Sequence, residues 1–258
     1  MRESGLAQAI RAVGGVSELA RQIGISQPSV SNWNRVPAER VLAVEALTGV
    51  SRSTLRPDLY REGKMNSEID EVDAARAREY ALLASLLLRA PDAKLLSQLT
   101  GLRGDASPLG LAHVGLADAA GRVRLETVER EFFALFIGIG RGEVLPYGSY
   151  YLTGFLHERP LARLREDLAT MGVARADDIA EPEDHAGILC EIMAGLCSGA
   201  LPAPEGSDRV IFEKHMAPWI GRFFADVERA EAAEFYRSVG LLGRTLIALE
   251  AEAFALPS

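Results

Sequence analysis

From Ala74 to the end of the chain, apolar residues recur at steps of three and four residues, the spacing of one face of an α-helix. One such set consists of Val128, Phe132, Leu135, Phe136 and Ile139. No stretch alternates apolar and polar residues over the length of a strand, so a β-sheet is not predicted. The pattern predicts an all-α domain, a bundle of roughly eight helices.

Shorter helical patterns separated by glycines occupy the start of the chain. A helix over residues 5–14 ends at a pair of glycines, and a second helix begins near Ser17, a residue suited to cap it. Gly24 follows, and a third helix is predicted over residues 27–35 with a proline in its first turn. A fourth helix ends at Gly49. This arrangement predicts a small bundle of helices.

The second and third of these helices fit a helix-turn-helix. Gly24 supplies the left-handed backbone that the tight turn requires, and Ala20 is small where the two helices approach. The apolar residues of the pair are spaced to pack inward. The third helix then exposes polar side chains: Gln27, Ser29, Ser31, Asn32 and Arg35. Gln and Asn can pair with adenine and Arg with guanine in the major groove, so this set predicts DNA contacts.

Residues 4–62 resemble the Cro-like and YdaS-like repressor modules of phage type, and the tail VPAERVLAVEALTGVSRSTLRPDLY matches as well as the helix pair. The resemblance implies a DNA-binding domain, which we assign to residues 1–62. Two other readings stay open: a bundle that uses this spacing only for packing, and a module that has lost DNA binding. A homodimer would suit DNA binding, since such modules read paired half-sites.

The charge of the chain is unevenly distributed. Residues 1–64 hold nine Lys or Arg and six Asp or Glu, a balance of +3, so the other residues hold 19 against 30, a balance of −11. A basic piece joined to an acidic piece indicates two partners of different kinds. Residues 63–73 are polar and lack apolar periodicity, which predicts a linker before a second domain over residues 74–258.

The sequence also bears on location. No apolar segment of signal-peptide type opens the chain, and no uncharged apolar run reaches the length of a membrane span, so we expect no membrane insertion. Cys190 and Cys197 lie seven residues apart, so on a helix they share a face, a geometry that disfavours a disulfide between them. We therefore expect a cytoplasmic protein.

Two segments depart from the regular helical pattern. The first is the stretch from Gly138 to Tyr151, in which glycines, a proline and tyrosines lie between two helices; such a connection suggests a binding surface. The second is EPEDH, Glu181 to His185, directly before an apolar helix. Acidic residues here also suit the first turn of a helix, so spacing alone does not assign a function.

Together these segments resemble the TorD/DmsD family of redox-enzyme maturation chaperones. The resemblance rests on EREFFALFIGIGRGEVLPYGSYYLTGFL, on EPEDHAGILCEIMAGL and on KHMAPWIGRFFADVERA, and it spans residues 74–252. It implies an all-helical, non-enzymatic chaperone that binds the twin-arginine signal peptide of a molybdenum enzyme, or its apoprotein, without a cofactor of its own. The form LPYGSYYLTGFL looks most like members associated with formate dehydrogenases.

The resemblance also implies peptide-binding residues: Pro146, Gly148, Ser149, Glu181, Asp184 and His185. Tyr147 stands where the family commonly has tryptophan. The chemistry of the residues agrees with the resemblance, because Asp184 with Glu181 or Glu183 can accept guanidinium donors. We expect Tyr147, Tyr150 and Tyr151 to take the apolar part of the peptide or to stack on an arginine.

Two other functions stay open. The first is a transcriptional regulator that uses the chaperone-like domain as a sensor. The second, a metal or hydrolytic enzyme, would have to use Asp184, His185, Cys190 and Glu191. It is disfavoured because the histidines have no paired ligand spacing and the chain has no nucleophile motif, P-loop or GxGxxG fingerprint. We therefore expect neither catalytic residues nor a metal.

Overall fold

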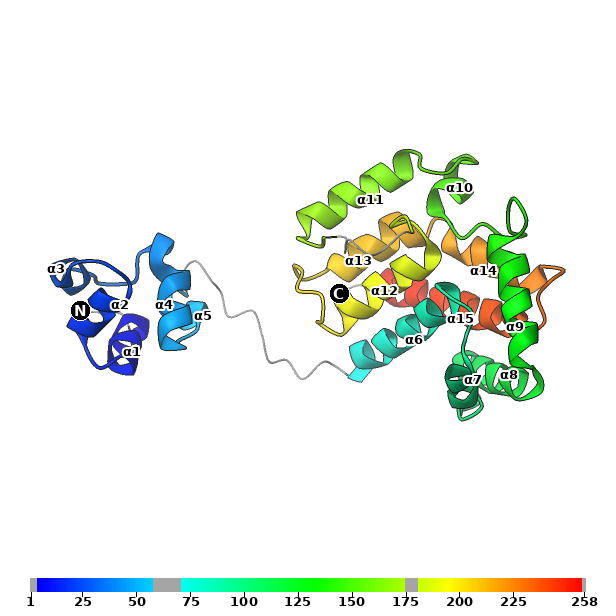
Figure 1. Ribbon diagram of the computed structural model, residues 1–258, viewed down its shortest axis with the longest axis horizontal. Coiled ribbons are helices and arrows are strands. Elements are labelled where there is room, and N and C mark those ends of the chain that lie inside the picture. Colours follow the sequence, from blue (N-terminus) through cyan, green and yellow to red (C-terminus); the bar gives the residue numbers. More distant parts are fainter. Residues whose placement is uncertain (1–3, 58–70, 175–180, 257–258) are drawn as a thin grey trace. The chain divides into compact units, whose positions relative to one another are not determined.

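The computed structural model describes residues 4–57, 71–174 and 181–256, and it divides the chain into two compact units, Met1–Glu68 and Ile69–Ser258. All regular secondary structure in the described ranges is helical (Figure 1), which confirms the prediction of an all-α chain. Most of the predicted linker lies outside the described residues. Its last three residues, Glu71 to Asp73, instead form the first turn of a helix.

The N-terminal unit is a bundle of short helices around its own core. Its helices are α1 (Ser4–Ala12), α2 (Val16–Gln22), α3 (Gln27–Ser31), the 3-10 turn η1 (Ala38–Arg40), α4 (Val41–Thr48) and α5 (Arg52–Leu55). Fully buried side chains at its centre include Leu6, Leu19, Val30 and Leu55. Gly24 has φ 71° between α2 and α3, as the predicted tight turn requires.

The start of α2 and the end of α3 differ from the prediction in ways that affect the helix-turn-helix. Gly15, with φ 140°, precedes α2, so Ser17 lies inside the helix and does not cap it. The third helix ends at Ser31, whereas we predicted that it continues to residue 35. Ser, Asn and Trp are weak helix formers, and Trp33 packs against the core from beyond the helix end.

The C-terminal unit is a larger helical bundle. In its described part the helices are α6 (Glu71–Leu87), α7 (Ala93–Leu99), α8 (Pro108–Arg122), α9 (Leu125–Phe132), α10 (Gly148–Thr153), α11 (Arg159–Thr170), α12 (Ala186–Cys197), α13 (Ser207–Ile211), α14 (Ile220–Arg229) and α15 (Phe235–Ala255). Two π-helical turns, η2 (Phe133–Ile137) and η3 (Phe212–Met216), extend α9 and α13. The short helices α10 and α13 raise the number above the eight that we expected.

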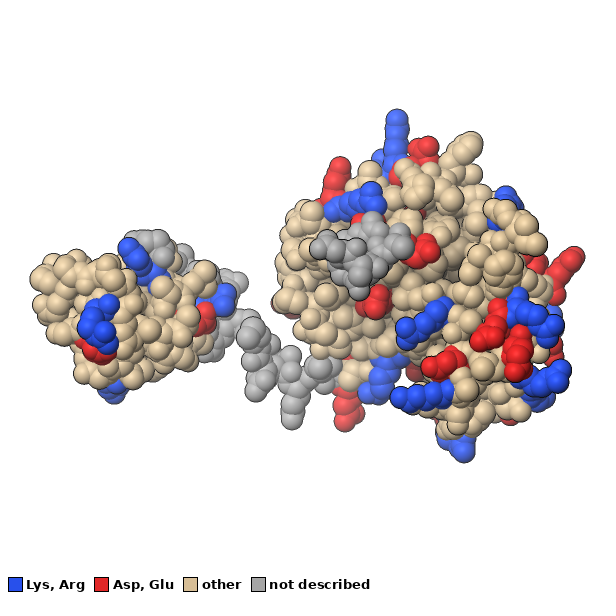
Figure 2. All heavy atoms as spheres, viewed as in Figure 1, with Lys and Arg blue, Asp and Glu red and all other residues tan. Residues whose placement is uncertain are grey.

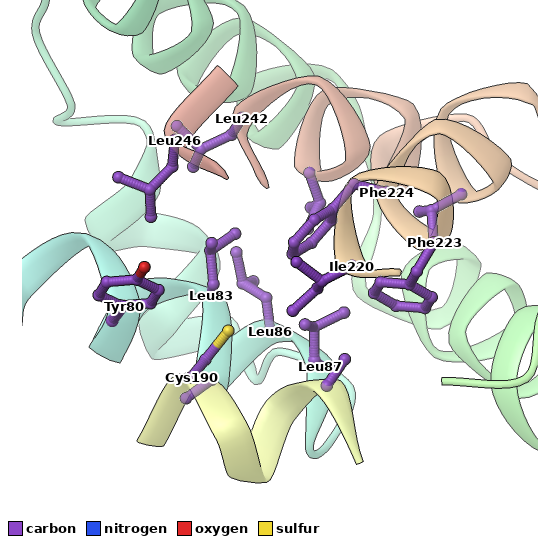
Figure 3. Close-up of a cluster of buried hydrophobic side chains, with 14 of the residues drawn as sticks. Tyr80, Leu83, Leu86, Leu87, Cys190, Ile220, Phe223, Phe224, Leu242 and Leu246 are labelled. Carbon is purple, nitrogen blue, oxygen red and sulfur yellow. The ribbon is translucent and has the colours of Figure 1, made fainter. Parts of the chain in front are cut away.

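Residues from many helices form the core of this unit, and four of these helices meet at its centre. Helix α6 packs against α12, and α14 packs against α15. Figure 3 shows leucines of α6, Cys190 of α12, aromatic residues of α14 and leucines of α15 directed toward one another. Burial of this apolar surface is the main favourable contribution to folding.

The end of α9 corrects another prediction. Val128, Phe132 and Leu135 are buried as expected, but Ile139 is 99% exposed. The π-helical turn ends at Ile137, and Gly138, with φ 63°, directs the chain out of the helix. The apolar period therefore stops before Ile139, which lies in the loop that leads to α10.

Figure 2 shows basic and acidic side chains interspersed on one face of this unit. No described helix is long and apolar enough to cross a membrane.

Candidate functional site

The two unusual segments of the sequence meet in the structure. Tyr147 and His185 form an isolated antiparallel bridge. On either side of it, the Gly148 N–H donates to the Asp184 carbonyl oxygen (2.9 Å) and the Ala186 N–H donates to the Pro146 carbonyl oxygen (2.7 Å). The PYGS and EPEDH segments, which lie more than thirty residues apart in sequence, are therefore joined by backbone hydrogen bonds.

Gly148 is required by close packing at the start of α10. A Cβ atom at this position would lie 2.9 Å from the indole nitrogen of Trp219. That indole nitrogen donates to the carbonyl oxygen of His215 (2.6 Å), which fixes the ring. A larger residue at position 148 would have to displace a buried tryptophan, so the glycine is needed for α10 to approach η3 and α14.

Asp184 is buried, with 4% of its surface exposed, and it caps α10 from a distance. Its Oδ2 accepts the backbone N–H of Ser149 (2.7 Å), in the first turn of that helix. Its Oδ1 has no hydrogen-bond partner, and neither does the Ser149 hydroxyl. These two are the only buried side-chain polar atoms without a partner in the described part of the chain. An open acceptor and an open hydroxyl therefore lie at one place.

The carboxylates beside Asp184 are already bonded. The Tyr147 hydroxyl donates to Glu181 (2.7 Å), and burial together with this bond raises the pKa of Tyr147 above its usual value. Arg165 of α11 pairs with Glu183 (2.7 Å). We predicted that Glu181 or Glu183 would share a guanidinium with Asp184, but both have partners from the chain itself.

His185 is a structural residue of this loop. Its Nδ1 accepts the backbone N–H of Gly187 (3.0 Å), so the side chain caps α12. Its ring meets the Tyr147 ring edge to face, with centroids 5.2 Å apart. Burial lowers the pKa of His185 to about 4, so the imidazole is neutral at pH 7. His185 therefore positions the backbone next to Asp184.

A groove with a volume of about 440 Å³ adjoins Asp184, and we call it the Asp184 groove. Gly148 and Leu152 of α10 line it on one side, and α11 and η3 form the other walls. The remaining lining residues are Pro160, Arg163, Leu164, Glu166, Asp167, Lys214, His215 and Trp219. In this wall Asp167 accepts from His215 (2.8 Å) and pairs with Lys214 (3.3 Å).

The structure does not gather the tyrosines on one surface. Tyr147 lies at the EPEDH loop, whereas Tyr150 and Tyr151 line a different cavity. The Tyr151 hydroxyl donates to Asp226 (2.8 Å), and its ring packs on Trp219. Of the predicted peptide-binding residues, only Gly148 and Asp184 line the Asp184 groove.

Sequence reasoning missed the groove residues from α11 and η3. We assigned no role to Arg163, His215 or Trp219. The segment KHMAPW, part of the resemblance, contains two of them and could have indicated them. Arg163 carries no such signal, because its place in the groove depends on how α11 packs.

The residues of the enzyme alternative do not converge. Cys190 is fully buried, and burial raises the pKa of its thiol. Glu191, the next residue of α12, is exposed, and the Nδ1 of His185 already accepts the backbone N–H of Gly187. Among the described residues no group of three or more His, Cys, Asp or Glu could hold a metal ion.

The predicted DNA-contacting residues lie on and after α3. Gln27 and Ser29 are exposed on the helix, where the Gln27 amide donates to the Ser31 hydroxyl (2.8 Å). Asn32 and Arg35 are exposed beyond the helix end, and not on the helix as predicted. Three of the five residues therefore lie on a short helix, and the other two lie just after its end.

Comparison with known proteins separates the same two parts of the chain. A family model described as the nitrate reductase delta subunit matches residues 103–225, and one described as the bacterial toxin YdaS matches residues 6–64. YdaS of Escherichia coli, described as a transcriptional regulator, is 45% identical over 58 residues, which cover 20% of this chain and 59% of YdaS.

The curated relatives of the larger part are chaperones and not enzymes. The chaperone protein TorD of Shewanella pealeana is 24% identical over 206 residues, covering 72% of this chain and 92% of that protein. TorD of Vibrio cholerae is 26% identical, covering 71% and 93%. A solved structure from Archaeoglobus fulgidus, described as a redox enzyme maturation protein, aligns with a TM-score of 0.47 at 22% identity, covering 75% of this chain and 99% of that one. The larger part of the chain is thus similar to the TorD chaperones, and the N-terminal part is similar to YdaS.

Proposed function

We propose that the C-terminal unit binds the twin-arginine signal peptide, or the apoprotein, of a molybdenum redox enzyme in the cytoplasm. The open Oδ1 of Asp184 carries this proposal. A buried acceptor without a donor costs roughly 1–3 kcal/mol, and a donor from a ligand would recover that free energy. A guanidinium suits this role because it is always charged and holds its N–H groups in a rigid plane.

The surroundings of Asp184 support a peptide ligand. Leu152, which lines the groove, is 42% exposed, so an apolar segment has a side chain to contact there. Pro146, Tyr147, Gly148, Ser149, Glu181 and His185 form or brace the two joined loops. Tyr150 lies away from this groove, and its role in peptide binding rests on the resemblance alone.

The proposed client is a formate dehydrogenase, on the strength of the LPYGSYYLTGFL segment. Its signal peptide should bind more tightly than the twin-arginine peptides of other molybdenum enzymes from the same organism. Equal affinities for all of these peptides would argue against a dedicated formate dehydrogenase client.

The N-terminal unit is proposed to bind DNA and to add regulation. Its recognition surface would consist of Gln27, Ser29, Ser31, Asn32 and Arg35. Each good bidentate base contact contributes roughly 1–3 kcal/mol of discrimination. A homodimer would let two modules read paired half-sites. The alternative is a transcriptional regulator in which the TorD-like domain only senses a ligand.

The peptide site is tested by Asp184→Asn in the full chain. Calorimetry with a synthetic twin-arginine peptide should show at least about tenfold weaker binding, since hydrogen bonds to charged groups contribute roughly 1.5–3 kcal/mol. Glu191→Gln, on the exposed face of α12, removes the same charge and should leave affinity unchanged. Equal affinities of the wild type and Asp184→Asn would refute the assignment of this site.

The DNA proposal has its own test. Replacement of Gln27, Asn32 and Arg35 by alanine should abolish preference for the upstream region of the gene over random duplex at moderate salt. If the signal peptide regulates this binding, peptide and DNA must change each other's affinity by the same factor. Loss of client activity in cells with Asp184→Asn, together with normal DNA binding, would favour the chaperone over the sensor alternative.

A further inference from the structure

The C-terminal unit has a second cavity, which the proposed peptide site does not use. It has a volume of about 670 Å³ and lies between the 141–145 loop, α10 and α14. It shares only Leu152 with the Asp184 groove. We call it the arginine groove, because Arg141, Arg222 and Arg229 all line it. Volumes of this size are common for small-molecule sites.

The three guanidinium groups of this groove are not neutralised. No side-chain hydrogen bond or ion pair joins the guanidinium of Arg141, Arg222 or Arg229 to any residue in the described part of the chain. By contrast, Arg244 of α15 binds Glu228 (2.8 Å). The lining holds these three arginines and two acids, Glu143 and Asp226, so its net charge is positive in a part of the chain whose overall balance is negative.

The acidic residues of the groove are engaged elsewhere. Both oxygens of Glu143 accept backbone N–H groups, from Glu231 (2.6 Å) and Ala232 (3.0 Å). Asp226 accepts from the Tyr151 hydroxyl (2.8 Å) and forms no ion pair with Arg222, one helical turn before it. These carboxylates therefore hold the walls of the groove and leave the arginines for a ligand.

One of the three guanidinium groups, that of Arg222, is positioned by an aromatic ring. The Arg222 guanidinium lies over the Tyr151 ring, 5.4 Å from its centroid. Tyr151 is held in turn by Asp226 and by Trp219, whose ring centroid is 5.5 Å away. A guanidinium stacked on a fixed ring loses less side-chain freedom when it binds a ligand. Tyr150 also lines the groove and can donate from its hydroxyl.

We propose that the arginine groove binds a phosphate-bearing ligand. The planar fork of arginine matches phosphate oxygens bidentately, and three such forks suit a group with more than one negative charge. A twin-arginine peptide would be repelled here, so this site is separate from the proposed peptide site and does not depend on it.

The experiment measures binding of inorganic phosphate and of pyrophosphate to the full chain by calorimetry at constant ionic strength. The test variant carries Arg222→Gln and Arg229→Gln. The matched control carries Arg78→Gln and Arg89→Gln, which remove the same charge from exposed positions outside the groove. Circular dichroism of both variants checks that the fold is retained.

We expect pyrophosphate to bind more tightly than phosphate. The test variant should weaken pyrophosphate binding at least about tenfold, while the control variant should change this affinity less than about twofold. Absence of binding to the wild type would overturn the proposal. Equal weakening by both variants would overturn it too, because the binding would then reflect overall charge. Binding of an acidic peptide at these arginines without pyrophosphate binding would assign the groove to a protein partner and equally contradict it.

Discussion

The α15 side of the larger unit and the EPEDH loop before α12 both bury carboxylates, but the hydrogen bonds that these carboxylates accept differ. Glu131, Glu250 and Asp184 are 6%, 4% and 4% exposed. Glu131 accepts three backbone N–H groups at the start of α15, and Glu250 receives Arg76 and the Tyr80 hydroxyl. Asp184 accepts one N–H and keeps Oδ1 open.

The number of accepted hydrogen bonds distinguishes Glu131 and Glu250, which stabilise the fold, from Asp184, which can still accept a donor from a ligand. A buried acid whose acceptors are all used stabilises the elements around it, and its loss should reduce stability. A buried acid with an open acceptor contributes less to the fold than its burial suggests. Stability measurements on these three positions, and on the neighbour His185, test this contrast.

Loss of Glu250 should have the largest effect. Glu250→Ala leaves the largely buried Arg76 without its bidentate partner and the buried Tyr80 hydroxyl without an acceptor. Removing one partner of a buried pair typically costs about 3–5 kcal/mol. Urea unfolding of the full chain should show this loss, whereas Glu252→Ala, two residues along on the exposed side, should change stability little. A loss below about 1 kcal/mol would contradict the structural role of Glu250.

His185 should make stability depend on pH. Its pKa is lowered by burial from 6.5 to about 4 in the folded state, so the unfolded chain binds the proton more tightly. The stabilisation is complete above pH 6.5 and is lost as the pH falls toward 4, by an amount on the order of 3 kcal/mol. His185→Asn, which can still cap α12, should remove this dependence. Identical pH profiles of unfolding for wild type and variant would contradict the shift.

Glu131 should have an intermediate effect. Glu131→Gln keeps one acceptor oxygen, but its amide NH2 then faces a backbone N–H at the start of α15. These two N–H donors would then face each other without an acceptor, and a buried donor left unsatisfied costs roughly 1–3 kcal/mol. Glu129→Gln, on the exposed side of α9, is the matched control in the same denaturation series. A Glu131→Gln variant as stable as this control would show that the cap contributes nothing.

These contrasts also show where sequence reasoning ends. The spacing of apolar residues predicted the helices because this periodicity can be read from neighbouring positions in the sequence alone. The resemblance indicated Pro146, Gly148 and Asp184, and the structure joins their segments. The pairing of Glu183 with Arg165 of α11 was not predictable, because it depends on how distant helices pack. The early end of α3 was missed because the packing of Trp33 against the core overrides the predicted period.

Asp184 should show the smallest change in stability. In Asp184→Asn the side-chain oxygen can still accept the Ser149 N–H, and the amide NH2 takes the place of an oxygen that had no partner. Only the difference between a charged and a neutral hydrogen bond is lost, about 1 kcal/mol or less. Its unfolding midpoint should therefore lie nearer the wild type than that of Glu131→Gln, although Asp184 is at least as buried as Glu131. A loss as large as that of Glu131→Gln would mean that Asp184 supports the fold, and the reason to place a ligand beside it would disappear.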